Sequence, residues 1–135
     1  MRHSLPLICC LGIAPALLSA CVDPGAEVGQ GSFAPAYGGI ETILLEGDLV
    51  NFRVAMNGAR GNDDVEAYGR CAAAQYALIR GAGFARHVRT TVAQTGNTWR
   101  GDAVYLISAA LPKGLKTIDA EVAVRDCGER GIPTI

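Results

Sequence analysis

An amphipathic stretch near the middle of the chain constrains the fold most. At 100° per residue, its large apolar side chains fall on one stripe, formed by Val65, Tyr68, Ala72, Tyr76 and Ile79. Gly81 and Gly83 follow and mark a helix end. Residues 64–82 are therefore predicted to form an α-helix that packs one side against a core.

The acidic residues at the start of this helix have two interpretations. Asn62, Asp63 and Asp64 supply N-cap candidates, and Glu66 can close back on Asp63 as in a capping box. The same residues could suggest a calcium site, but the D-x-D-x-D-G loop with its distal glutamate is absent. Helix capping is therefore the prediction.

Strand-like segments flank the helix. Two of them precede it and are separated by the turn signal Glu46-Gly47-Asp48, which predicts a β-hairpin. The last one alternates cleanly between apolar and polar residues. The five predicted strands cover residues 40–45, 49–56, 86–95, 99–111 and 118–125. The order ββαβββ predicts an α+β domain, with a single helix packed on an antiparallel sheet of about five strands.

The N-terminal segment has the three-part build of a secretory signal. A basic start at Arg2 precedes an apolar run over residues 5–18, and the small residues Ser19 and Ala20 follow. A membrane-spanning helix needs roughly 20 apolar residues, so this run is too short to be a permanent anchor.

The tetrad Leu18-Ser19-Ala20-Cys21 resembles the bacterial lipobox. That resemblance implies cleavage before Cys21, a diacylglycerol on its sulfur and a firm membrane anchor. Ordinary cleavage after Ala20, which would give a soluble secreted protein, is the alternative, but the bulky Leu18 disfavours it. In Gram-negative lipoproteins an Asp after the cysteine signals inner-membrane retention, and Val22 stands here. The expected location is the outer membrane, facing the periplasm.

Three regions are therefore expected: a signal peptide (residues 1–20), the lipidated cysteine with a flexible tether (21–38), and a small α+β domain (39–135). Glycine and proline dominate the tether. Its two aromatic residues, Phe33 and Tyr37, are candidates for docking back on the domain.

The charge balance argues against one class of partner. The full chain has a net charge of −1, and the signal peptide contains one basic residue, Arg2, and no acidic one. Nucleic-acid binding calls for a strongly basic face, so no nucleic-acid partner is expected. The expected partners are the membrane, through the lipid anchor, and an envelope protein. The oligomeric state stays open.

The five cysteines divide by position. Cys9 and Cys10 would leave with the signal, and Cys21 would be lipidated. Cys71 and Cys127 remain and are predicted to form a disulfide in an oxidising compartment. Two buried free thiols, or a reactive or metal-binding pair, are the alternatives. Cys127 follows the strand predicted over residues 118–125 and has the outward parity of Glu121 and Arg125, so the disulfide needs a loop or bulge after Arg125.

His87 is the one histidine outside the predicted signal. Together with Arg53, Arg86 and Arg89 it could form an anion-binding patch, or it could act as a general base. Because His87 and Arg89 are both expected to point away from the apolar side of their strand, a solvated strand face is favoured. Zinc-ligand spacing and a nucleophile elbow are missing, so no catalytic residue, metal or cofactor is predicted.

Residues 57–88, with the run CAAAQYALIRGAGF, are similar to small Gram-negative lipoproteins of unknown function. No functional residue carries over. The leading interpretation is a non-enzymatic envelope lipoprotein that binds a protein or another envelope component. A binding module for an anionic small molecule or glycan is the second, and an enzyme of unrecognised type the third. A concave pocket with converging arginines would favour the second, and a flat apolar face the first.

Overall fold

The computed structural model describes residues 32–135, so Cys21 and the predicted signal peptide lie outside the described residues. Seven elements make up the domain: β1 (Ala36–Leu44), β2 (Leu49–Asn57), α1 (Asn62–Ile79), β3 (Phe84–Thr95), β4 (Thr98–Ser108), β5 (Thr117–Asp119) and α2 (Ala120–Glu129). The structured chain thus begins within the predicted tether, before residue 39.

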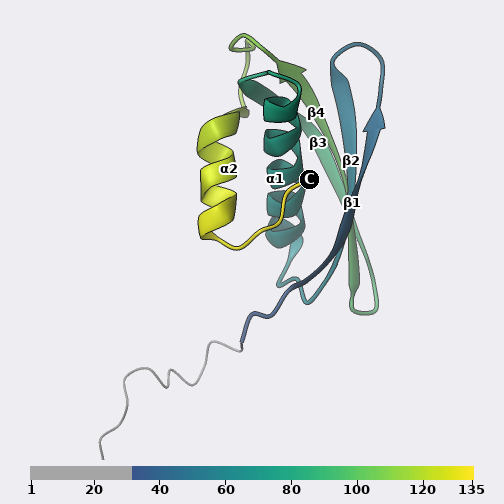
Figure 1. Ribbon diagram of the computed structural model, residues 1–135. Coiled ribbons are helices and arrows are strands. Elements are labelled where there is room, and N and C mark those ends of the chain that lie inside the picture. Colours follow the sequence, from purple (N-terminus) through teal and green to yellow (C-terminus); the bar gives the residue numbers. More distant parts are fainter. Residues whose placement is uncertain (1–31) are drawn as a thin grey trace, which may run out of the picture. The chain divides into compact units, whose positions relative to one another are not determined.

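The domain has two layers. Its five strands form one antiparallel sheet in the order β1-β2-β4-β3-β5. Both helices lie on the same face of this sheet (Figure 1), with α1 packed on β2, β3 and β4 and α2 packed on α1. The predicted α+β class, the antiparallel five-stranded sheet and the order ββαβββ are confirmed.

The second helix corrects the sequence prediction of a single helix and of a strand over residues 118–125. Only β5 is extended there, and α2 follows at once. Asp119 caps the helix by accepting a hydrogen bond from the Val122 N–H at 3.1 Å. The buried residues of α2 are Ala120, Ala123 and Cys127, a helical spacing that the apparent alternation concealed.

The core lies between α1 and the sheet. As predicted, Val50, Phe52, Val54 and Met56 share one face of β2, and all are buried. On α1 the predicted stripe is buried at its first three positions and half-buried at Tyr76. Ile79 departs from the prediction: at the last residue of the helix it is 59% exposed.

The start of α1 also differs from the prediction. Gly61 is the N-cap, and no side chain caps the helix, so the predicted capping box is absent. The Asp64 carboxylate instead accepts hydrogen bonds from the Arg60 backbone N–H at 2.7 Å and from its guanidinium at 2.8 and 3.0 Å. These bonds to Arg60 hold the pKa of Asp64 below its usual value.

Both aromatic residues of the predicted tether contact the domain. The Arg60 guanidinium lies 3.7 Å from the centre of the Phe33 ring, and Tyr37 packs edge-on against Tyr68 with ring centres 4.8 Å apart. The Tyr68 hydroxyl also accepts a hydrogen bond from the Gly39 N–H at 3.1 Å. The first described residues are thus joined to α1.

The Cys71 and Cys127 sulfurs form a disulfide that links α1 to α2. The sequence placed Cys127 on the outward face of a strand, where it could not reach Cys71. In the structure Cys127 lies on the buried side of a helix, so the disulfide can form. Both residues are fully buried in the core cluster that also contains Val65 and Tyr68. The disulfide therefore fixes the outer helix to the rest of the domain.

Candidate functional site

The sheet face opposite the helices is open, because within residues 32–135 no helix covers it (Figure 1). A groove of about 670 Å³ crosses this face over β1, β2, β4 and β3. Small residues form much of its lining, among them Ala55 and Ala93. A ligand could therefore approach the strands closely. We call it the open-face groove.

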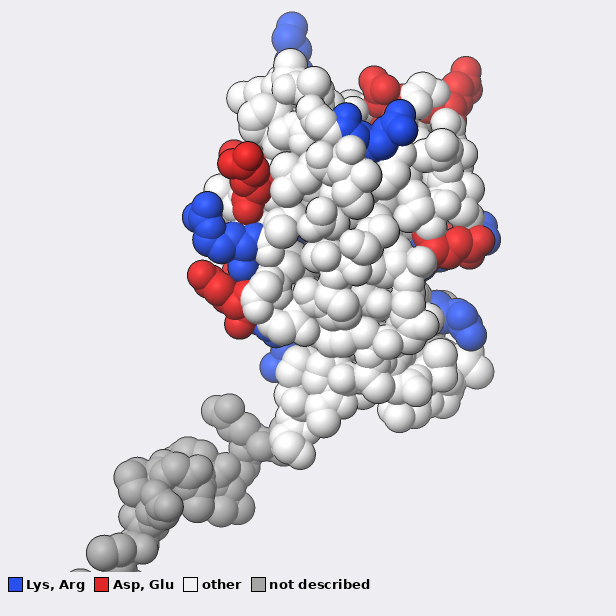
Figure 2. Space-filling view, viewed as in Figure 1, with Lys and Arg blue, Asp and Glu red and all other residues white. Residues whose placement is uncertain are grey.

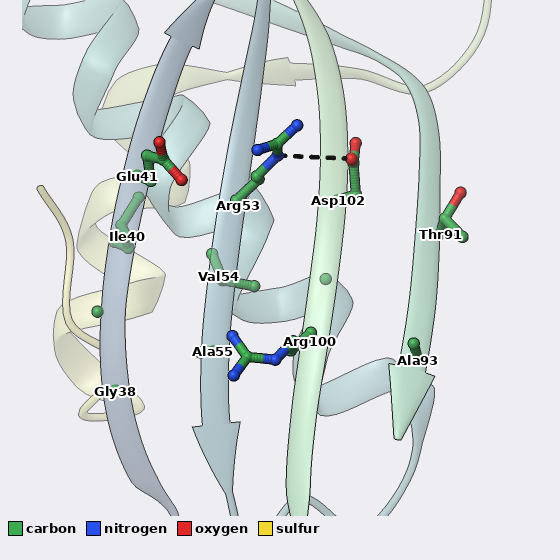
Figure 3. A pocket seen from close by; sticks show the side chains of 12 residues that line it. Gly38, Ile40, Glu41, Arg53, Val54, Ala55, Thr91, Ala93, Arg100 and Asp102 are labelled. Carbon is green, nitrogen blue, oxygen red and sulfur yellow. Dashed lines mark ion pairs between the residues drawn. The ribbon is translucent and has the colours of Figure 1, made fainter. Parts of the chain in front are cut away.

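An ion-pair cluster borders the groove (Figure 3). The Arg53 Nε lies 3.9 Å from one Asp102 oxygen, and Arg89 Nη1 lies 3.3 Å from the other. Both arginine side chains are more than half exposed, and such surface pairs stabilise little. Two guanidinium groups sharing one carboxylate leave hydrogen-bond donors available to a ligand.

Arg100 adds a third positive charge. It is opposite Ala55 in the register of β2 and β4, and Figure 3 shows its guanidinium extending toward β2. Among the described residues no carboxylate forms an ion pair with it. Glu41 lies across from Arg53 on β1 and is the groove's second acidic residue. The groove is thus concave, with two arginines in its lining.

The predicted patch of Arg53, Arg86, His87 and Arg89 is only partly assembled. The pairing of β3 with β4 shifts between His87 and Arg89, where Val88 forms a bulge. The bulge places His87 on the helix side, opposite Tyr105, and leaves Arg89 on the open face. The prediction that both point away from the apolar side is therefore wrong for His87.

Arg86 lies apart from the other members of the patch. It pairs with Leu106 and Thr117 in the sheet, its side chain lies near Gly114, and its Nε is buried without a partner in the described residues. Arg53 and Arg89 alone come together, through Asp102. Sequence reasoning missed Arg100, although strand alternation places it on the same face as Asp102.

His87 lies in a second cavity, of about 560 Å³, on the helix side of the sheet. Its Nε2 is 2.8 Å from the Thr90 hydroxyl. Burial, followed by the nearby Lys116 charge, lowers the pKa of His87 and so favours the neutral form of its ring. Burial also raises the pKa of Tyr105, which lies beside it, to about 12. His87 is thus not on a solvated strand face.

The described residues contain no group of three or more His, Cys, Asp or Glu side chains that could hold a metal ion. None of the helices in this part of the chain is long and apolar enough to cross a membrane. On the face seen in Figure 2, acidic and basic side chains lie mostly toward the margins. Neither the positive nor the negative side chains form a single patch there.

Residues 37–131 match the YNQ4 C-terminal domain family. The chain belongs to this family. The matched range runs from β1 to just beyond α2, so both cavities and the disulfide of this YNQ4 C-terminal domain lie within it.

A relative in Paracoccus denitrificans, described as "Uncharacterized 26.9 kDa protein in nqo8 5'region", is 32% identical over 85 residues. The match covers 63% of this chain and 33% of the relative, so the chain spans about a third of that protein. No solved structure matches the chain. Neither the family nor the relative is described by an activity, a ligand or a partner.

Proposed function

We propose that this protein is exported, lipid-anchored through Cys21, and acts as a non-enzymatic binding module on the periplasmic side of the outer membrane. The disulfide between Cys71 and Cys127 carries the proposal. Disulfides persist in oxidising compartments and are rare where thiols are kept reduced. The disulfide therefore supports export independently of the lipobox-like tetrad at residues 18–21.

The open-face groove is the binding surface in this proposal. It is concave, and Arg53 and Arg100 present guanidinium donors along it. Guanidinium groups favour carboxylate, phosphate and sulfate oxygens, and the small residues between them leave room for an extended chain. These features fit an anionic envelope glycan better than they fit a flat apolar docking face for a protein.

The anchor is tested by Cys21→Ala, with Cys10→Ala as the matched control inside the predicted signal. Cys21→Ala is expected to abolish incorporation of radiolabelled palmitate and to remove the protein from the membrane fraction, because the acyl chains supply the binding free energy. Cys10→Ala should leave both unchanged. Full membrane retention of the Cys21→Ala protein would contradict the lipid anchor.

The groove is tested with dextran sulfate, an extended polyanionic glycan, and the full chain purified in detergent. Arg100→Glu is expected to weaken binding by about tenfold, since it removes charge-assisted hydrogen bonds and adds repulsion. Arg125→Glu makes the same charge change on an exposed residue of α2 and should have little effect. Equal weakening by both variants would show that only net charge matters and would contradict a groove site.

A further inference from the structure

We propose that the cavity around His87 is a second ligand site and that it binds a small molecule bearing a carboxylate or phosphate group. This site, the His87 pocket, lies on the helix side of the sheet. It is lined by α1 residues together with His87, Tyr105, the segment 116–118 and Arg130 at the end of α2. It is therefore independent of the open-face groove and of the anchor. Its volume of about 560 Å³ lies in the range of small-molecule sites.

An unpartnered hydroxyl at Tyr105 is the first observation. Tyr105 is only 4% exposed, and its ring packs edge-on against Phe52 and His87. Among residues 32–135 its hydroxyl has no hydrogen-bond partner, although the residue lines the pocket. The Thr117 hydroxyl, which also lines the pocket, is fully buried and has no hydrogen-bond partner in the described chain. A buried hydroxyl without a partner is costly, and native proteins usually satisfy such groups. A ligand oxygen in the pocket would give both hydroxyls a partner.

The fixed orientation of His87 is the second observation. Thr90 engages its Nε2 at 2.8 Å, and the Tyr105 ring centre lies 5.1 Å from the imidazole centre. The His87 backbone N–H also donates to the Lys116 carbonyl at 3.0 Å, which holds the segment bearing Lys116 beside the pocket. The ring nitrogen Nδ1 has no partner in the described chain, so it is available to a ligand.

The charges around the pocket favour an anionic group. Lys116, Arg70 and Arg130 bring positive charge, while Glu66 and Asp63 bring negative charge. Asp126 pairs with Arg70 at 3.3 Å and with Arg130 at 3.6 Å, whereas Lys116 has no ion-pair partner in the described part of the chain. An oxyanion between the Lys116 ammonium and the Tyr105 hydroxyl would receive hydrogen bonds from both. Ala67 and Ile118 supply apolar walls for the rest of the molecule.

The test uses inorganic phosphate and benzoate as probes and the full chain purified in detergent. After loss of the predicted signal, His87 is the only histidine, so its imidazole NMR signals report the pocket without ambiguity. We expect a saturable shift of these signals with at least one probe. The bound anion should also raise the pKa of His87, because it adds negative charge beside Lys116, Arg70 and the ring. A shift with phosphate alone would indicate a phosphate site, and a shift with benzoate alone would indicate a carboxylate site.

Tyr105→Phe is the decisive variant, since it removes the unpartnered hydroxyl and keeps the ring in the core. It should fold normally and bind the active probe about tenfold or more weakly. Tyr76→Phe, which removes a hydroxyl outside the pocket, should bind as the wild type does. Should Tyr105→Phe fail to fold, Lys116→Gln serves instead and should weaken binding without loss of structure. No saturable shift with either probe, or unchanged binding by a folded Tyr105→Phe or Lys116→Gln protein, would overturn the proposal.

Discussion

Replacing both members of the Cys71–Cys127 disulfide with alanine is expected to lower the free energy of unfolding by about 4 kcal/mol. The two cysteines are 56 residues apart, so their bond removes much conformational freedom from the unfolded chain. The structure adds a second reason. Helix α2 packs mainly on α1 and touches the sheet chiefly at β5, so few other contacts hold it in place.

Urea denaturation of the protein in detergent measures this loss against the wild type. A reductant should destabilise the wild type and leave the double variant unchanged. Hydrogen exchange should also become faster in α2 than in β2 or β4, because α2 loses its covalent link to the core. A double variant as stable as the wild type would contradict this role of the disulfide.

Gly101→Ala is expected to destabilise the domain by about 2 kcal/mol through overpacking. A Cβ at this position of β4 would lie 2.6 Å from Val65 Cγ1 and 2.9 Å from Val54 Cγ2. Both valines are buried, one on α1 and the other on β2, so neither can move aside into solvent. The absence of a side chain at Gly101 is what lets α1 approach the centre of the sheet.

Gly128→Ala is the matched control, because a Cβ there meets nothing within 4 Å and the residue lies in α2. Alanine favours a helix over glycine, so this variant should unfold at the same or a slightly higher urea concentration. Val65→Ala combined with Gly101→Ala should lose less stability than the two single changes added together, since the smaller side chain frees the space. Full additivity would show that the clash with Val65 is not the cause.

The spacing of apolar residues predicted most of the fold, because most elements bury one face and follow the repeat of a single type of secondary structure. Strand β2 alternates, β4 contains a continuous apolar stretch, α1 has a helical stripe, and Gly81 ends that helix as expected. Helix α2 was predicted as a strand because its short apolar side chains also alternate over residues 118–125. The Asp119 cap and the spacing of Ala120, Ala123 and Cys127 were the available helical signals.

The arrangement of the candidate sites was less predictable. Strand parity carries through a sheet only while the register is unbroken, and the bulge at Val88 reverses it between His87 and Arg89. No turn residue marks this bulge in the sequence. The open-face groove also depends on strand order, since β4 brings Arg100 and Asp102 between β2 and β3. Strand order follows from tertiary packing, which local patterns do not encode.

The proposed anchor is tested most directly by the mass of the N-terminal peptide of the protein recovered from its own cell envelope. We expect a peptide that begins at Cys21 and carries a diacylglycerol on the sulfur, with or without a further acyl chain on the new N-terminus. A peptide that begins at Cys21 without lipid, or one that still contains the Leu18-Ser19-Ala20 sequence, would contradict the lipid-anchored envelope protein proposed above.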